Sequence, residues 1–181
     1  MKNQGTKQLE TQRLTLRKFT TEDAPDMFYG WASDENVTRY LTWSPHKSPE
    51  ETLSLIRSRV EKYDDLLYYN WAVEEKNTHE LIGNISVISV SSKNHNCEIG
   101  YCYGSRYWNR GYATEALKAV IDYLLHECGM HIVEAKYHSI NPASGRVMEK
   151  AGMVQEAVLK ERRYHPETDS YCDLIYYSIK K

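Results

Sequence analysis

Residues 107–116 read YWNRGYATEA and join two different kinds of sequence pattern. The strand-like run CEIGYCYG precedes them, and from Thr114 onward apolar residues recur at helical spacing as far as Gly129. A strand-to-helix junction of this kind exposes free backbone N–H groups at the positive end of the helix. Gly111 permits a backbone conformation that other residues resist, and Ala113 is small enough for a phosphate to approach. The stretch therefore predicts a phosphate-binding turn, with a plain glycine turn before a buried helix as the alternative.

The chain lacks the two common nucleotide-binding signatures. It has no G-x-x-x-x-G-K-[ST] loop and no G-x-G-x-x-G fingerprint. A phosphate bound at residues 107–116 therefore belongs to another class of ligand.

Upstream of this turn the sequence predicts a strand and two helices. Residues 13–18 alternate as a half-buried strand, and Thr21 is placed to cap a helix that runs through Trp31. Ser48 and Pro49 open a second helix that reaches about Tyr63. The connection at 34–47 is rich in aromatic residues, and its length suggests a role beyond joining the helices.

Strands dominate the rest of the prediction. The runs at 68–75, 81–92 and 97–104 are expected to form an antiparallel meander, and 132–139 a further strand after the helix that ends at Gly129. A short helix then begins after Asn141 and ends at Gly152. A last hairpin is expected from 155–164 and 171–179, turning through 165–169.

Composition excludes several function classes. The 181 residues suffice for one domain, expected to span 1–181. Twenty-three basic and 25 acidic side chains give a net charge of -2, so we expect no nucleic-acid partner and no attraction to anionic membranes. The first residues lack the apolar core of a signal peptide, which favours a cytoplasmic protein. The four cysteines form no C-x-x-C pair and the seven histidines no zinc-binding spacing, so we predict reduced thiols and no metal.

Four segments, in order, carry a family resemblance. They read LETQRLTLRKFTTEDA, WASDENVTRYLTW, EIGYCYGSRYWNRGYATEAL and NPASGRVMEKAGM. Together they resemble the GNAT-superfamily N-acetyltransferases of the ribosomal-protein (RimJ/RimL-like) type. The resemblance implies an α+β GNAT fold in the order β-α-α-β-β-β-α-β-α-β-β, with a mixed seven-stranded sheet, helices on both faces and a splayed central strand pair. It also implies acetyl-CoA as the acyl donor and a primary amine as the acceptor.

The resemblance assigns the cofactor residues. The family loop [RQ]-x-x-G-x-[GA] matches at Gly111 and Ala113, with Trp108 at its first position as in this subfamily. The resemblance then implies that backbone amides of Asn109, Arg110, Gly111, Tyr112, Ala113 and Thr114 hold the pyrophosphate of coenzyme A. Arg106, Arg110 and Lys118 are candidates for nearby positive charge.

The pantetheine arm is expected along Ile99, Tyr101, Cys102 and Tyr103 and against Asn141, with an amide near Tyr101 or Cys102 polarising the thioester. Gly100 is expected to mark the bulge that splays this strand from the next.

The catalytic assignments include two departures from the family. The tyrosine that many members use as general acid is replaced by Met148, so Ser144 is the remaining donor for the departing thiolate, unless it only caps a helix. Glu98 is the candidate base, or a solvated glutamate at the end of a strand. The second glutamate of the ribosomal-protein enzymes is replaced by Arg163, which counts against a ribosomal substrate.

The acceptor remains open at this level. Candidate acceptor-binding residues are Tyr40, Trp43, His46, Arg163 and Tyr164, with core packing or solvent exposure as the alternative for each. A protein or peptide α-amine leads, because its low pKa reduces the need for a base. The alternatives are a small amine such as a polyamine, an amino acid or an antibiotic, and an acyl-CoA sensor without turnover. The family also makes a homodimer plausible.

Overall fold

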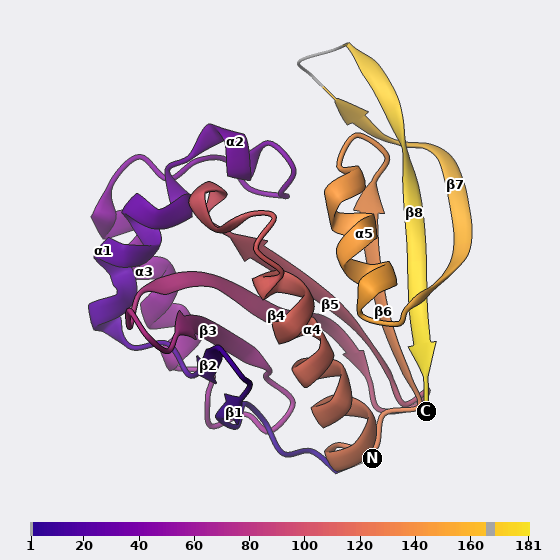
Figure 1. The fold of residues 1–181 in the computed structure, drawn as a ribbon, viewed down its shortest axis with the longest axis horizontal. Coiled ribbons are helices and arrows are strands. Elements are labelled where there is room, and N and C mark those ends of the chain that lie inside the picture. Colours follow the sequence, from indigo (N-terminus) through magenta and orange to yellow (C-terminus); the bar gives the residue numbers. More distant parts are fainter. Residues whose placement is uncertain (1, 166–168) are drawn as a thin grey trace.

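The computed structural model describes residues 2–165 and 169–181. Its centre is an eight-stranded sheet in the order β1-β2-β3-β4-β5-β6-β8-β7, shown in Figure 1. The strands are β1 (Leu9–Glu10), β2 (Leu14–Arg17), β3 (Asn70–Glu75), β4 (Leu81–Ser91), β5 (Asn96–Tyr103), β6 (Ile132–His138), β7 (Val154–His165) and β8 (Ser170–Lys180). The α-helices are α1 (Ala24–Met27), α2 (Glu35–Thr38), α3 (Pro49–Val60), α4 (Tyr112–Asp122) and α5 (Pro142–Lys150).

The seven predicted strands all form, and the two-residue β1 adds an eighth at the edge. The first helix starts one residue earlier than predicted, at the cap Thr20, and is divided into a 3-10 turn (Thr21–Asp23), α1 and a π-helical turn (Phe28–Ala32). Ser48 caps α3 as predicted, by accepting from the Glu51 amide. The predicted turn at 165–169 includes residues 166–168, which lie outside the described part of the chain.

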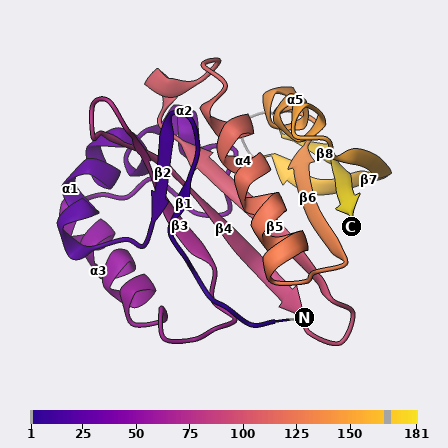
Figure 2. The ribbon, with the colours of Figure 1, turned by 60° about the horizontal axis from the view of Figure 1, so that its bottom comes forward.

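Helices cover both faces of the sheet, as predicted. On β3 the side chains alternate, so that Trp71 and Val73 enter the core beneath α4 and α5, whereas Ala72 enters the core beneath α1 and α3. Figures 1 and 2 show α4 beside α5 and α1 beside α3. Among the described residues, no helix is long and apolar enough to cross a membrane.

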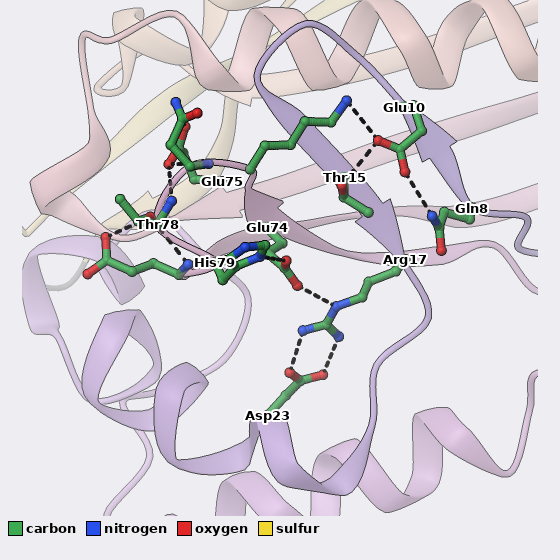
Figure 3. A network of polar contacts seen from close by, with 12 residues as sticks. Gln8, Glu10, Thr15, Arg17, Asp23, Glu74, Glu75, Thr78 and His79 are labelled. Carbon is green, nitrogen blue, oxygen red and sulfur yellow. Dashed lines mark hydrogen bonds and ion pairs between the residues drawn. The ribbon is translucent and has the colours of Figure 1, made fainter.

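Arg17 ties the first helix to the sheet. Its guanidinium donates to both carboxylate oxygens of Asp23 at 2.8 Å and, through Nε, to Glu74 at 2.8 Å (Figure 3). Asp23 also accepts from the Thr20 amide at the helix start. Arg17 lies on β2, and its side chain contacts both β3 and the start of the helix. This network therefore holds the 3-10 turn and α1 against β2 and β3.

The sheet opens between β5 and β6. These strands are parallel and pair only from Asn96 with Ile132 to Ile99 with Ala135, although β5 continues to Tyr103 and β6 to His138. Figure 1 shows the two strands together near the C-terminus and separated at their far ends. The splayed pair therefore forms as predicted.

The bulge beside this opening lies on β4, which corrects the prediction for Gly100. The register shifts between Val87 and Ser89, leaving Ile88 as the extra residue. A Cβ on Gly100 would lie 2.5 Å from Cδ1 of Ile88. A side chain at position 100 would therefore have to displace the end of the bulged, exposed isoleucine.

Candidate active site

A cleft of about 360 Å³ lies where β5 and β6 separate. It is bounded by the loop after α2, the free end of β5, the turn before α4, and α5. Its lining brings together most of the predicted cofactor residues and one predicted acceptor residue: Tyr40, Tyr101, Cys102, Tyr103, Asn109, Gly111, Tyr112, Ala113, Thr114, Asn141 and Ser144.

The end of β5 offers unpaired backbone groups to this cleft. The amide of Gly104 donates to Ile82 on β4, and Cys102 pairs with Asn84 on the same strand. Since successive residues of a strand direct their backbone groups to opposite sides, the amides of Tyr101 and Tyr103 face the open edge. Trp108 Nε1 already donates to the Tyr103 carbonyl at 2.8 Å. The open edge therefore keeps two N–H donors for a bound ligand.

Two of the β5 predictions change with this geometry. Ile99 is the last residue paired on both sides, with Val87 and Ala135, so its backbone is enclosed in the sheet. The amide of Cys102 faces β4, which leaves Tyr101 rather than Cys102 as the residue able to polarise a thioester through its amide. The thiol of Cys102 is buried, and this burial raises its pKa to about 12.

The turn before α4 has the backbone shape of an anion site. Asn109 and Gly111 both have left-handed backbone conformations, with φ of 61° and 82°. Gly111 is the N-cap of α4, so the first amides of this helix have no partner on the preceding turn. Alternating left- and right-handed residues at a helix N-terminus orient several N–H groups towards one point. The predicted pyrophosphate turn therefore has suitable geometry at Asn109 to Thr114.

Arg13 fastens this turn to the sheet, a role that the sequence analysis missed. Its Nε and Nη2 both lie 2.7 Å from Oε2 of Glu115 on α4, and its Nη1 donates to the Arg110 carbonyl at 3.0 Å. Thr11 donates to the same carboxylate at 2.6 Å. Arg13 lies at the start of a predicted strand, and its partner Glu115 is 102 positions away on a helix. The alternation of residues in a strand cannot indicate such a distant contact.

The N-terminal half of α5 forms the opposite wall. Asn141 is its N-cap, makes no capping bond with its side chain and lines the cleft. Ser144 lies one turn into the helix, and its Oγ is 2.9 Å from the hydroxyl of Tyr101 on β5. Met148 is only 1% exposed and belongs to the core, so it presents no polar group to the cleft. Ser144 therefore lies in the cleft, and its role as the donor to the departing thiolate stays a prediction.

The cations in the cleft lining come from α5. Arg146 and Lys150 lie one turn apart on α5 and both contribute to the lining, whereas Arg106, Arg110 and Lys118 do not. Arg106 instead lies 3.6 Å from Glu80. No aspartate or glutamate is found among the described residues that line the cleft. The cleft is therefore suited to an anionic ligand.

The predicted acceptor residues separate in space. Tyr40 lines the cleft beside Leu41. His46 turns towards α3, where its Nδ1 lies 2.7 Å from Thr52 Oγ1, and its ring packs against Trp43. Tyr164 lies on the last hairpin, with its ring against Tyr171 and its hydroxyl donating to Asp169. Trp43, His46 and Tyr164 therefore make contacts away from the cleft lining.

Arg163 connects the last hairpin to the loop after α2. Its Nη2 donates to the Leu41 carbonyl at 2.6 Å and its Nη1 to Nε2 of His138 at 2.7 Å. Burial and the Arg163 charge lower the pKa of His138 to about 4, so His138 is neutral near pH 7. The arginine therefore bridges one wall of the cleft and the free end of β6.

Glu98 lies outside the cleft lining and makes an ion pair. Its Oε2 accepts from Lys136 on β6 at 2.9 Å. Burial alone would lower the pKa of Lys136, but the hydrogen bond and charge of Glu98 raise it overall. Glu98 as a base stays a prediction, and this contact shows that the carboxylate would have to exchange its partner to act.

Comparisons with known proteins identify the fold family. The model of the acetyltransferase (GNAT) domain matches residues 13–154. The chain is 34% identical over 173 residues to the uncharacterized N-acetyltransferase YoaA of Bacillus subtilis, covering 96% of each protein. It is 26% identical to the ribosomal protein uS5 alanine N-acetyltransferase of Escherichia coli, covering 84% of this chain and 81% of that protein.

Solved structures agree over nearly the whole chain. A GNAT acetyltransferase from Bacillus anthracis superposes with a TM-score of 0.83 at 28% identity, covering 96% of this chain and 98% of that one. RimL, a ribosomal L7/L12 α-N-protein acetyltransferase in complex with coenzyme A, superposes with a TM-score of 0.84 at 18% identity, with the same coverage. The microcin C7 self-immunity acetyltransferase MccE, in complex with acetyl-CoA and AMP, has a TM-score of 0.79 at 17% identity, covering 94% of each chain.

Proposed function

The chain belongs to the GNAT acetyltransferase family and is an acetyltransferase, and from that premise we propose that it moves acetyl from acetyl-CoA to the α-amino group of a protein or peptide. One observation carries the proposal. The cleft between β5 and β6 combines an open strand edge, a left-handed turn at a helix N-terminus and two cations on α5. We also infer that residues 1–181 form one domain, because β7 and β8 extend the same sheet beyond the matched family region.

The residues present fit coenzyme A. The turn from Asn109 to Thr114 would hold the diphosphate through backbone amides, and Arg146 and Lys150 would add positive charge from α5. The open edge of β5 and the side chain of Asn141 would bind the polar groups of the pantetheine arm. Acetyl-CoA supplies a thioester to this site, and the protein supplies the groups that bind and polarise it.

Acetyl transfer requires hydrogen-bond donors at two places. The amide of Tyr101 would donate to the thioester oxygen as negative charge develops there. The hydroxyl of Ser144 would donate to the departing sulfur. An α-amine has a pKa of about 7.7 to 8.0, so a useful fraction is uncharged at neutral pH. The acceptor can therefore react with little help from a protein base. The variant E98Q tests whether Glu98 acts as such a base.

The charge of the cleft favours an α-amine over a polycation. Polyamines and aminoglycosides carry several positive charges that acidic side chains would have to match, and the described lining presents no carboxylate. The names of two similar proteins add support, because the E. coli uS5 enzyme and RimL are both described as acetyltransferases of ribosomal proteins. Arg163 stands where the family resemblance implies a glutamate in the ribosomal-protein enzymes. The proposed acceptor is therefore an α-amine, and not specifically that of a ribosomal protein.

The test is release of the coenzyme A thiol from acetyl-CoA with a panel of amines. The panel contains N-terminal peptides beginning with Ala, Ser or Met, the same peptides with blocked α-amines and a free lysine, polyamines and aminoglycosides. Turnover restricted to free α-amines is the expected result. Turnover on polyamines or aminoglycosides alone would contradict the proposed acceptor while keeping the acetyltransferase chemistry.

A further inference from the structure

Tyr101 and Ser144 form a hydroxyl pair across the cleft. The Tyr101 hydroxyl lies 2.9 Å from Ser144 Oγ and 3.0 Å from the Ser144 carbonyl oxygen. The tyrosine belongs to β5 and the serine to α5, so the pair connects the two walls that the splay separates. Both residues line the cleft. The pair is thus placed where a ligand between β5 and α5 would meet it.

Two hydrogen-bonding arrangements satisfy these distances. The Tyr101 proton can point to the Ser144 carbonyl, and Ser144 then donates back to the tyrosine oxygen. Alternatively, Tyr101 donates to Ser144 Oγ, which frees the serine proton to point elsewhere. Burial raises the pKa of Tyr101 above its ordinary value, so the phenol remains a protonated donor at neutral pH. The second arrangement lets Ser144 donate into the cleft.

Ser144 has no other hydroxyl neighbour on its own helix. Among the residues of α5 it alone carries a hydroxyl, and Met148, one turn further on, is a buried thioether. Tyr137 is also close to α5, but its ring packs on Gly145, where a Cβ would lie 2.6 Å from its Cζ. Within the described chain, the hydroxyl bonded to Ser144 is therefore that of Tyr101.

We propose that Tyr101 is a positioning residue for acetyl transfer, whose hydroxyl donates to Ser144 Oγ and so orients the serine proton towards the departing sulfur. The inference rests on the proposed function, and in particular on the role of Ser144. When the C–S bond breaks, sulfur leaves with the electron pair and is stabilised by the serine hydroxyl. The proton that sulfur finally carries is the one released by the acceptor nitrogen, so Tyr101 keeps its own proton. The hydrogen bond from Ser144 to sulfur is stronger when Ser144 itself accepts one from Tyr101, because each hydrogen bond polarises the next.

The test compares Y101F, S144A and the double variant Y101F/S144A with the wild type. The control is Y137F, which removes a hydroxyl beside the same helix but one not bonded to Ser144. Thiol release is followed with any amine that supports turnover, since the leaving group is the same for every acceptor. The Kd of acetyl-CoA and the melting temperature are measured for each variant, so that loss of binding or folding is separated from loss of turnover.

We expect Y101F to lower kcat about 10-fold, the effect of one good hydrogen bond, with the Kd of acetyl-CoA changed less than about 2-fold. Y137F should retain the wild-type kcat. In the S144A background, Y101F should have little further effect, because the residue through which it acts is gone. An unchanged kcat in Y101F, or a loss that multiplies with that of S144A, would overturn the inference. Normal turnover by S144A would overturn both the inference and the donor role of Ser144, while the proposed acetyl transfer to an α-amine would stand.

Discussion

At the scale of single residues, the site depends on backbone conformations that few side chains allow. Gly111 has a φ of 82° at the N-cap of α4, in the turn proposed to hold the diphosphate. A Cβ there would also meet Nη2 of Arg13 at 3.4 Å. The same arginine fixes the turn through Glu115, and a Cβ at Gly111 would lie at ordinary contact distance from it, so the strain of a substitution comes from the backbone. The glycine is evident from the sequence, whereas its anchor is seen only in the structure.

Replacement of Gly111 by alanine is expected to weaken donor binding. The left-handed conformation costs a non-glycine residue about 1 to 2 kcal/mol, which opposes the shape of the turn. The Kd of acetyl-CoA, measured by titration calorimetry, should rise about 10-fold. The matched control is G30A, because Gly30 has an ordinary φ and a Cβ added there would have no neighbouring atom within 4 Å. Equal affinities for G111A and the wild type would show that the turn does not hold the diphosphate.

At the scale of secondary-structure elements, α5 supplies two cations that were not predicted, and β7 supplies Arg163, whose partners were not predicted. Arg146 and Lys150 are one turn apart on α5 and face the cleft because the helix packs against α4 through the opposite side, where Met148 is buried. Arg163 comes from β7, at a shift in its register with β8 between Leu159 and Arg163. Beside this irregularity, the arginine reaches the Leu41 carbonyl and His138.

Loss of the two α5 cations is expected to reduce the affinity for the donor. The double variant R146A/K150A should raise the KM for acetyl-CoA about 10- to 30-fold with kcat nearly unchanged, since charge is removed far from the thioester. K118A provides the comparison, because Lys118 is exposed on α4 and does not line the cleft. A larger effect from K118A than from the double variant would place the phosphates on the other side of the turn.

Loss of the Arg163 bridge is expected to affect the acceptor more than the donor. R163A removes the donors to Leu41 and His138, so the loop after α2 should become less fixed beside Tyr40. The KM for the peptide acceptor should rise about 10-fold, the cost of losing hydrogen bonds from a charged group. R163K keeps the charge but lacks the fork that reaches two partners, so it should restore little. Equal rises in KM for peptide and acetyl-CoA would contradict this assignment.

At the scale of the whole molecule, ion pairs join elements that are distant in the chain. Arg17 connects β2, β3 and the start of the first helix, and Arg13 connects the β2 edge to α4 (Figure 3 shows the former). Burial raises the pKa of Glu74 and Glu115, but hydrogen bonds and ion pairs with these arginines lower it below 4.5 overall. Carboxylates whose pKa is lower in the folded than in the unfolded state stabilise the fold at pH values above their unfolded-state pKa. This contribution is lost as the pH falls through their folded-state pKa.

The free energy of unfolding should therefore fall from about pH 5 downward, and part of this fall should depend on Arg17. R17M is expected to cost about 2 kcal/mol at pH 7, because it removes the arginine partner of the buried Asp23 and of the partly buried Glu74. Urea unfolding at pH 7 and pH 3.5 measures both effects, and the loss between these pH values should be smaller in R17M. R57M is the control, since Arg57 is exposed on α3. An identical pH dependence in R17M and the wild type would exclude this origin of acid sensitivity.

The sequence determined the elements and the turn before α4, because periodicity, helix caps and the conformation of Gly111 depend on residues only a few positions apart. The family motifs also carried the splayed strand pair. Tertiary structure alone decided the pairs Tyr101 with Ser144, Arg13 with Glu115 and Arg163 with Leu41, which lie 43, 102 and 122 positions apart. It likewise placed the bulge at Ile88 and turned His46 and Tyr164 away from the cleft. These contacts depend on how strands and helices pack and on where registers shift, and no local pattern in the chain specifies either.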